Sequence, residues 1–343
     1  MVEENERTLE ARMIAFLSRF EGAENIDEQI SEDALSKGKR ADFLLDERRI
    51  VLELKTLKAN PAGKIDERLS VHRNRPDFPV FCGKVDLNRV LAPLHDGEKI
   101  RHEIFHAVTR SVQTALEKAD DQIGATKKAL GLQGATGLVV ILNEGVAILP
   151  PDHIAAKASQ FLLKKRDGEI RYQNIGYVLI VSESHTVTGL GGSRTSPLLL
   201  LSGPYAQEAD PAQTELSRLM REWAASEGAP FIDMGQVEHL DDVDFQARST
   251  PQTEEAKRPP VRHEVWREQY RAKPYLRDLS EEQFIDHVLR LLATLTRQME
   301  QPFSGPPNAE TADLMEKWTH ALEEAEYRAL DMRKVHERWA KTR

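Results

Sequence analysis

Residues 40–55 read Arg-Ala-Asp-Phe-Leu-Leu-Asp-Glu-Arg-Arg-Ile-Val-Leu-Glu-Leu-Lys. Two extended, largely apolar runs flank a charged centre, which predicts a β-hairpin that turns about Glu47-Arg48. In a symmetric antiparallel pair centred there, Asp42 lies directly opposite Glu53, with Cβ atoms about 4.5–5.5 Å apart. The sequence therefore predicts two carboxylates brought together by the register of one hairpin.

The alternation of side chains along the second strand places a lysine beside this pair. Val51, Glu53 and Lys55 share one face. The opposite face is apolar and consists of Ile50, Leu52 and Leu54. Two carboxylates about 5 Å apart repel by roughly 3 kcal/mol at an effective dielectric near 20. A divalent cation reverses that sign, and oxygen ligands favour Mg²⁺ or Mn²⁺. With a lysine to orient the attacking water and balance charge, the trio suits metal-assisted phosphodiester hydrolysis.

The order of elements around these residues resembles the PD-(D/E)XK nuclease superfamily over about residues 5–205. A helix precedes the strands that bear Asp42, Glu53 and Lys55, and a helix and further apolar strands follow. The resemblance implies an α/β, restriction-endonuclease-like mixed sheet flanked by helices. It also implies that Asp42 and Glu53 bind Mg²⁺ or Mn²⁺ and that Lys55 is the catalytic lysine. Ala41 stands where the name-giving proline would be, a frequent departure.

Two further residues join the candidate catalytic set through the same resemblance. Many members add an acid from the first helix, and Glu10 is the best match because it flanks that helix's apolar stripe. Members often place a polar residue on the helix after the hairpin, where Gln113 is the preferred candidate. His106 lies on the same polar face and would touch the phosphate backbone.

A rival motif occupies the same helix. His102-Glu103-Ile104-Phe105-His106 matches H-E-x-x-H, in which both histidines bind one zinc ion and the glutamate is the general base. The metzincin continuation is absent, and no recognisable third ligand follows. A zinc metallopeptidase is therefore one alternative function. A non-catalytic nucleic-acid-binding or interaction protein with a nuclease-like fold is another.

Basic residues near the hairpin are candidates for substrate binding. Arg40 lies within a cation-rich strip, residues 37–58, and His72, Arg73 and Arg75 lie on the loop that follows. Contacts of this kind with phosphates position a nucleic acid without reading its sequence. A salt-bridged surface loop is the other interpretation. The net charge of −9 argues against coating nucleic acid by bulk charge, although it allows one local basic strip.

Hydrophobic periodicity predicts the remaining elements. Helices are expected at residues 3–20, 99–130, 152–165, 214–227, 280–300 and 309–341. Extended segments are expected at residues 26–30, 40–45, 49–57, 137–143, 176–182 and 198–201. The continuous apolar runs at 137–143 and 176–182 are typical of strands buried on both faces.

The resemblance, together with a change in composition near residue 250, implies the domain organisation. A nuclease domain covers residues 1–248, with its core at about 5–205 and an insertion at 58–99. A linker or arm follows at 249–262, and a helical C-terminal region covers 263–343. These last helices would serve a homodimer or a partner protein.

Composition narrows the classes of protein that remain. The chain has 343 residues, of which 40% are hydrophobic and 30% charged, as in ordinary globular proteins. We expect a cytoplasmic protein with no membrane partner, because no apolar run reaches about 20 residues. The single cysteine, Cys82, excludes an intramolecular disulfide framework and a multi-cysteine zinc site. The expected partner is a nucleic acid, DNA rather than RNA, in a role such as prokaryotic defence or repair.

Overall fold

The computed structural model divides into two compact units. It describes residues 7–29, 39–81, 86–188, 194–206, 211–229, 231–233, 235, 240, 243–248, 262–299 and 309–342. The first unit is drawn from residues 1–67 and 104–250, and the second from residues 68–103 and 251–343. Lys37, Cys82 and residues 249–261 of the expected linker lie outside the described ranges.

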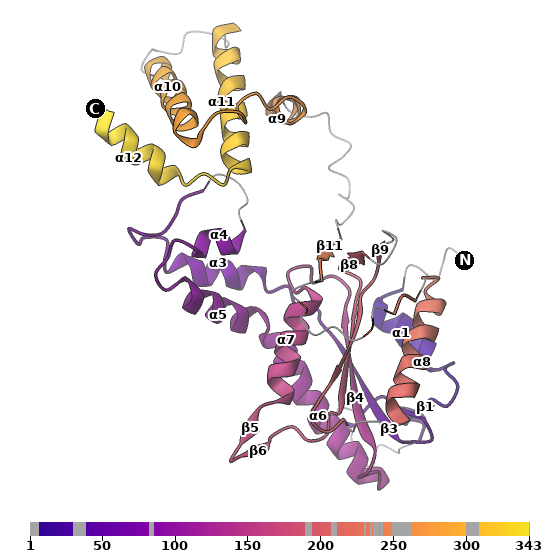
Figure 1. Ribbon diagram of the computed structural model, residues 1–343. Coiled ribbons are helices and arrows are strands. Elements are labelled where there is room, and N and C mark those ends of the chain that lie inside the picture. Colours follow the sequence, from indigo (N-terminus) through magenta and orange to yellow (C-terminus); the bar gives the residue numbers. More distant parts are fainter. Residues whose placement is uncertain are drawn as a thin grey trace. The chain divides into compact units, whose positions relative to one another are not determined.

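The first unit is built on a mixed β-sheet, which confirms the α/β class (Figure 1). Among the described residues, its strands follow the order β1-β2-β3-β4-β7-β10. They are β1 (Glu24–Asn25), β2 (Phe43–Leu45), β3 (Ile50–Thr56), β4 (Thr136–Asn143), β7 (Tyr177–Ser182) and β10 (Leu198–Ser202). The pairs β3–β4 and β4–β7 are parallel, and the other pairs are antiparallel. All residues of β7 are buried, as expected for a strand covered on both faces.

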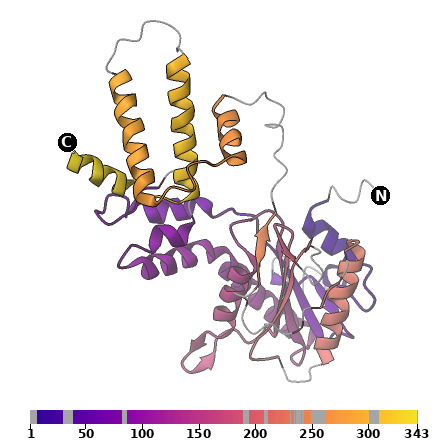
Figure 2. The same ribbon diagram turned by 45° about the horizontal axis from the view of Figure 1, so that its top comes forward.

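Helices cover both faces of this sheet. Helices α1 (Leu9–Leu17) and α8 (Pro211–Ser226) lie on one face, and α6 (Arg110–Leu130) and α7 (Pro151–Leu162) on the other (Figures 1 and 2). Smaller pairings involve β5 (Lys165–Arg166) with β6 (Glu169–Ile170), and β8 (His185–Thr188) with β9 (Arg194–Thr195) and β11 (Phe245–Ala247). No helix in the described part of the chain is long and apolar enough to cross a membrane.

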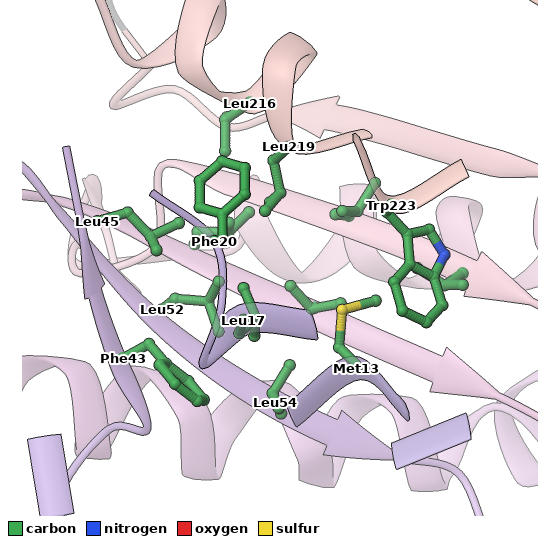
Figure 3. Packing of buried hydrophobic residues seen from close by; sticks show 14 of the residues in the cluster. Met13, Leu17, Phe20, Phe43, Leu45, Leu52, Leu54, Leu216, Leu219 and Trp223 are labelled. Carbon is green, nitrogen blue, oxygen red and sulfur yellow. The ribbon is translucent and has the colours of Figure 1, made fainter. Parts of the chain in front are cut away.

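The predicted alternation along β3 is confirmed by the core. Leu52 and Leu54 pack with Met13, Leu17 and Trp223 in the hydrophobic layer between the sheet and helices α1 and α8 (Figure 3). The intervening residues of β3 therefore face α6. The polar and apolar sides of one strand thus serve two different layers of the molecule.

The hairpin register is also confirmed. Phe43 pairs with Leu52 and Leu45 with Ile50, so the turn is centred between Glu47 and Arg48, as predicted. Residues 46–48 all have positive φ, between 52° and 67°. Non-glycine residues adopt this left-handed region at a cost, so the strand pairing on either side imposes the turn.

Three expected elements are wrong in detail. The segment at residues 26–30 is not extended, because Ile26–Gln29 form the short helix α2. The Asn25 side chain accepts a hydrogen bond from the Asp27 N–H at 3.0 Å, which starts the helical turn. The expected helix at 99–130 is two helices, α5 (Gly97–Val108) and α6, which break at Thr109. The Thr109 hydroxyl donates to the Phe105 carbonyl at 2.7 Å, a bond that bends helices.

The expected helix at 309–341 is likewise two, α11 (Ala309–Tyr327) and α12 (Met332–Thr342). Ala329 takes a left-handed φ of 48°, and Leu330 N–H donates to the Ala325 carbonyl at 2.9 Å. A left-handed residue after the last turn is a common helix end.

The second unit joins the segment after β3 to the C-terminal helices. Its helices include α4 (Leu87–Leu91), α9 (Arg262–Ala272), α10 (Glu281–Met299), α11 and α12, while α3 (Ala62–Ser70) and α5 begin or end in the first unit. Met332 N–H donates to the Val80 carbonyl at 2.6 Å, and Phe81 bridges to Asp331. The part of the expected insertion from residue 68 to 99 thus belongs to the same unit as the C-terminal helices.

The core position of Leu52 generates a stability prediction. Leu52 has no exposed surface, and Leu52→Ala should lower the free energy of unfolding of the first unit by about 2–5 kcal/mol through lost burial and a cavity. The measurement is a urea titration with amide hydrogen exchange of β3 and β4 as the readout. Ile14→Ala is the control because Ile14 is 41% exposed, and it should change stability by less than about 0.5 kcal/mol. Equal effects of the two changes would contradict the observed packing.

Candidate active site

The hairpin brings Asp42 and Glu53 together at the sheet face that α6 covers. Asp42 N–H donates to the Leu52 carbonyl at 3.0 Å. Asp42 therefore extends the β2–β3 ladder by one residue before the start of β2 and stands opposite Glu53. The Leu54 N–H donates to Asp42 Oδ2 at 2.7 Å. Glu53 is only 2% exposed because β3 lies between β2 and β4. A local register thus sets the buried carboxyl group of Glu53 against the half-buried one of Asp42.

Lys55 is held beside this pair from two sides. Its ammonium group contacts Glu53 Oε1 and donates to Gln122 Oε1 at 2.6 Å. The Gln122 amide in turn donates to the Arg40 carbonyl at 3.1 Å. Gln122 therefore links α6, the catalytic-lysine candidate and the start of the hairpin. An ammonium group has three N–H donors, so one remains for a water molecule or a phosphate oxygen.

Burial makes the charged forms of the two carboxyl groups unfavourable. Burial first, and then the charge of Asp42, raise the pKa of Glu53 to about 8 against the attraction of Lys55. The pKa of Asp42 is also raised, chiefly by burial, although the Leu54 N–H opposes that shift. Among the described residues, no group donates a hydrogen bond to the buried Glu53 Oε2. Such an oxygen needs a proton or a cation.

These residues fit a divalent cation. Asp42 and Glu53 supply hard carboxylate oxygens, and Glu53 Oε2 has no partner in the described structure. Within the described ranges, no three His, Cys, Asp or Glu side chains gather as a complete metal-binding group. Two carboxylates suit Mg²⁺, which usually keeps several waters and completes its octahedron with substrate phosphates.

Arg40 and Asp27 form a second pair next to the carboxyl groups. Arg40 Nε lies 2.6 Å from Asp27 Oδ1, and Arg40 is only 4% exposed. Arg40 was expected to bind substrate, but its guanidinium group lies against Asp27 on α2. The charge of Asp27 is among the influences that raise the pKa of Asp42. The sequence interpretation missed Asp27 because it assigned that segment to a strand.

The structure brings Gln122, and not Gln113, to Lys55. The two glutamines are nine residues apart on α6, which is two and a half turns and about 13 Å along the axis. They therefore point to opposite sides of the helix. The Gln113 amide donates to Glu117 Oε1 at 3.1 Å. The polar stripe on this helix correctly indicated that a glutamine approaches the site. It did not specify which turn of α6 meets β3.

The other expected residues have partners of their own. On α1, Glu10 Oε2 is 3.0 Å from the Lys58 ammonium group, just after the end of β3. Arg75 is ion-paired with Asp77 at 2.7 Å and Asp96 at 2.8 Å, and its guanidinium lowers the pKa of Asp77 to about 2. The loop that also holds His72 and Arg73 is thus salt-bridged, which was the other interpretation of this segment. These three residues belong to the second unit.

The H-E-x-x-H residues share helix α5, as expected. His106 Nδ1 lies 3.3 Å from the Lys157 ammonium group on α7. Phe105, within the motif, packs edge-on against His153 at 5.7 Å between ring centroids. The described part of the chain adds no third ligand to His102 and His106.

A cavity of about 740 Å³ lies elsewhere in the first unit, beside β10 and α8. Its lining includes Leu200, Trp223 and Phe245. Asp42, Glu53 and Lys55 are not among the residues that line it. The carboxyl pair is therefore a site on the sheet and its covering helix, separate from this cavity.

The chain matches no protein-family model, no curated protein and no solved structure. The function proposed below therefore rests on the geometry and chemistry of the site itself.

The raised pKa of Glu53 generates a prediction on pH. A raised pKa means that the folded chain binds this proton more tightly than the unfolded chain. Its stabilisation is complete below the ordinary value, 4.5, and is lost as the pH rises to about 8. In EDTA, the free energy of unfolding should therefore fall over this window by a few kcal/mol more for the wild type than for Glu53→Gln.

Thermal and urea unfolding across the same pH range measure this difference. Glu21→Gln, which removes an exposed carboxylate from the same unit, should follow the wild type. Parallel pH profiles for the wild type and Glu53→Gln would contradict the assigned shift.

Proposed function

We propose that this chain is a Mg²⁺- or Mn²⁺-dependent nuclease of the PD-(D/E)XK type that hydrolyses phosphodiester bonds in DNA. One observation carries the proposal: the buried Glu53 carboxyl, to one oxygen of which no described group donates, lies against half-buried Asp42 and beside a lysine whose ammonium group is already oriented. An arrangement that destabilises the metal-free protein in this way is typical of a functional site.

The order of elements supports a restriction-endonuclease-like fold. The antiparallel β2–β3 hairpin carries the acids, and α6 returns the chain so that β4 lies parallel to β3. A further crossover through α7 adds β7 in parallel. Helix α1 precedes these strands and packs on the far face. This is the succession that the resemblance to the superfamily requires.

The residues divide the chemistry between them. Asp42 and Glu53 would hold the cation, which would act as a Lewis acid on the scissile phosphate and lower the pKa of a coordinated water. Lys55 would direct its remaining N–H to the attacking water or to a non-bridging phosphate oxygen. Gln122 would keep that ammonium group in place, so its role is positioning. Charge that develops on the phosphate would meet donors that are already oriented.

The first test is cleavage by the full chain. With Mg²⁺ or Mn²⁺, the protein should cut duplex DNA, whereas Glu53→Gln and Lys55→Ala should lower the rate at least about 100-fold. Mn²⁺ should also raise the Tm of the wild type but not that of Glu53→Gln, a readout independent of activity. Glu21→Gln is the control and should behave as the wild type in both assays.

Cleavage that survives both site variants would refute the assignment. Parallel reactions with single-stranded DNA and with RNA decide the substrate class. Stoichiometric zinc that His106→Ala removes would instead favour the metallopeptidase.

Gln122 and Gln113 provide a matched pair for the positioning role. Gln122→Ala should lower kcat about 10- to 100-fold with little change in KM, because the Lys55 ammonium group loses one of its two fixed partners. Gln113→Ala removes the same group from the opposite side of α6 and should leave kcat unchanged. Equal losses in the two variants, or a loss confined to Gln113→Ala, would contradict the assignment of Gln122. Gln122→Glu, which keeps an acceptor for Lys55, should restore part of the rate.

A further inference from the structure

The β5–β6 hairpin projects from the first unit after the end of α7 (Figures 1 and 2). Lys165 pairs with Ile170 and Arg166 with Glu169. The turn between them has positive φ at Asp167 (54°) and Gly168 (90°), as in the tight turns that suit a twisted hairpin. Except for half-buried Ile170, all residues from 164 to 171 are exposed. A two-stranded ribbon of this kind is marginally stable alone. Because its side chains are exposed, packing constrains few of them.

The register of this hairpin concentrates positive charge on one face. Arg171 N–H donates to the Lys164 carbonyl at 2.9 Å, which extends the ladder and sets Lys164 directly opposite Arg171. Arg166 and its cross-strand partner Glu169 share that face because side chains alternate along a strand, so the face holds three cations and one acid. Like charges directly opposite each other destabilise a strand pair. The ion pair of Arg166 with Asp167, at 3.6 Å and almost fully exposed, offsets little of this repulsion.

Charged groups on the helices behind the hairpin feel its positive charge. Lys157 on α7 has a lowered pKa, chiefly because of burial and then because of repulsion from Lys164. Glu117 on α6 has a lowered pKa because Gln113 donates to it, while Lys164 and Arg171 add attraction. The cations outnumber the acids at this surface. The exposed cations are Lys164, Lys165, Arg166 and Arg171, and the acids are Glu117, Asp167 and Glu169.

Helix α6 connects this surface to the carboxyl pair. Tyr172, next to the hairpin, donates its hydroxyl to Glu117 at 3.1 Å, and Gln122 donates to the Arg40 carbonyl at the site. Glu117 and Gln122 are five positions apart, which is about 7 Å along the helix axis and about 140° around it. The hairpin surface and the carboxyl pair therefore lie on different sides of α6.

We propose that the positive face of the β5–β6 hairpin binds backbone phosphates of duplex DNA outside the cleavage site. The inference rests on the proposed nuclease function for its substrate. A two-stranded ribbon fits the major groove, which is about 12 Å wide. Lys164, Arg166 and Arg171 would then neutralise phosphates, so the repulsion within the free hairpin is relieved by binding. The contacts position the duplex and carry no sequence preference.

The test is the salt dependence of binding by the full chain in EDTA, where the duplex stays uncut. With a labelled duplex of about 30 base pairs, Lys164→Gln/Arg166→Gln should weaken binding about 10-fold at low salt and reduce the slope of log K against log [salt] by about 1 to 2. Asp167→Asn/Glu169→Gln should have the opposite effect and tighten binding. Two variants of opposite sign separate a charge effect from a folding defect.

The matched control is Lys273→Gln/Lys341→Gln, which removes two exposed cations from the second unit. Its affinity and salt slope should equal those of the wild type. Equal slopes for the hairpin variant and the wild type, or no binding of the duplex, would overturn the inference. Binding that depends on the hairpin in a chain that never cleaves DNA would support the inference while refuting the nuclease proposal.

Discussion

The register of the β2–β3 hairpin is the constraint on which the rest of the site depends. It sets Asp42 opposite Glu53 and, through the alternation of β3, sends Leu52 and Leu54 into the opposite layer. A slip of one residue would exchange these faces, burying a carboxylate in the apolar core and a leucine against α6. The packing of α1 and α8 therefore fixes the geometry of the carboxyl pair, although neither helix needs to touch it.

The same burial gives the site its chemical character. An exposed pair of carboxylates would be screened by water and would bind a cation weakly. Beneath α6, Glu53 prefers to hold a proton up to about pH 8, and one of its oxygens has no hydrogen-bond partner among the described residues. Lys55, held between Glu53 and Gln122, cannot relieve both oxygens. The fold thus leaves a buried carboxyl oxygen that only a proton or a cation can satisfy.

The hairpin could be predicted from sequence because its information is local. The turn position, the register and the two faces of β3 all follow from sixteen consecutive residues. Gln122 could not be identified in this way, because periodicity defines the face of a helix but not its shift along the neighbouring strand. The break at Thr109 makes that shift harder to predict. One side-chain hydrogen bond ends the helix there, although the apolar periodicity of the sequence continues. Asp27 was missed for a similar reason, the Asn25 side chain that turns a short strand into a helix.

The second unit can fold only late in synthesis, because it joins segments that lie far apart in the chain. Val80 pairs with Asp331, 251 residues later in the chain, so the segment after β3 emerges from the ribosome long before its partner exists. At about 5–20 residues per second, that interval lasts roughly 10–50 s. The hairpin and its sheet emerge before the C-terminal helices. Residues 68–103 also emerge before the helices with which they form a unit. A nascent or truncated chain therefore lacks the partner of this segment until the C-terminal helices have been made.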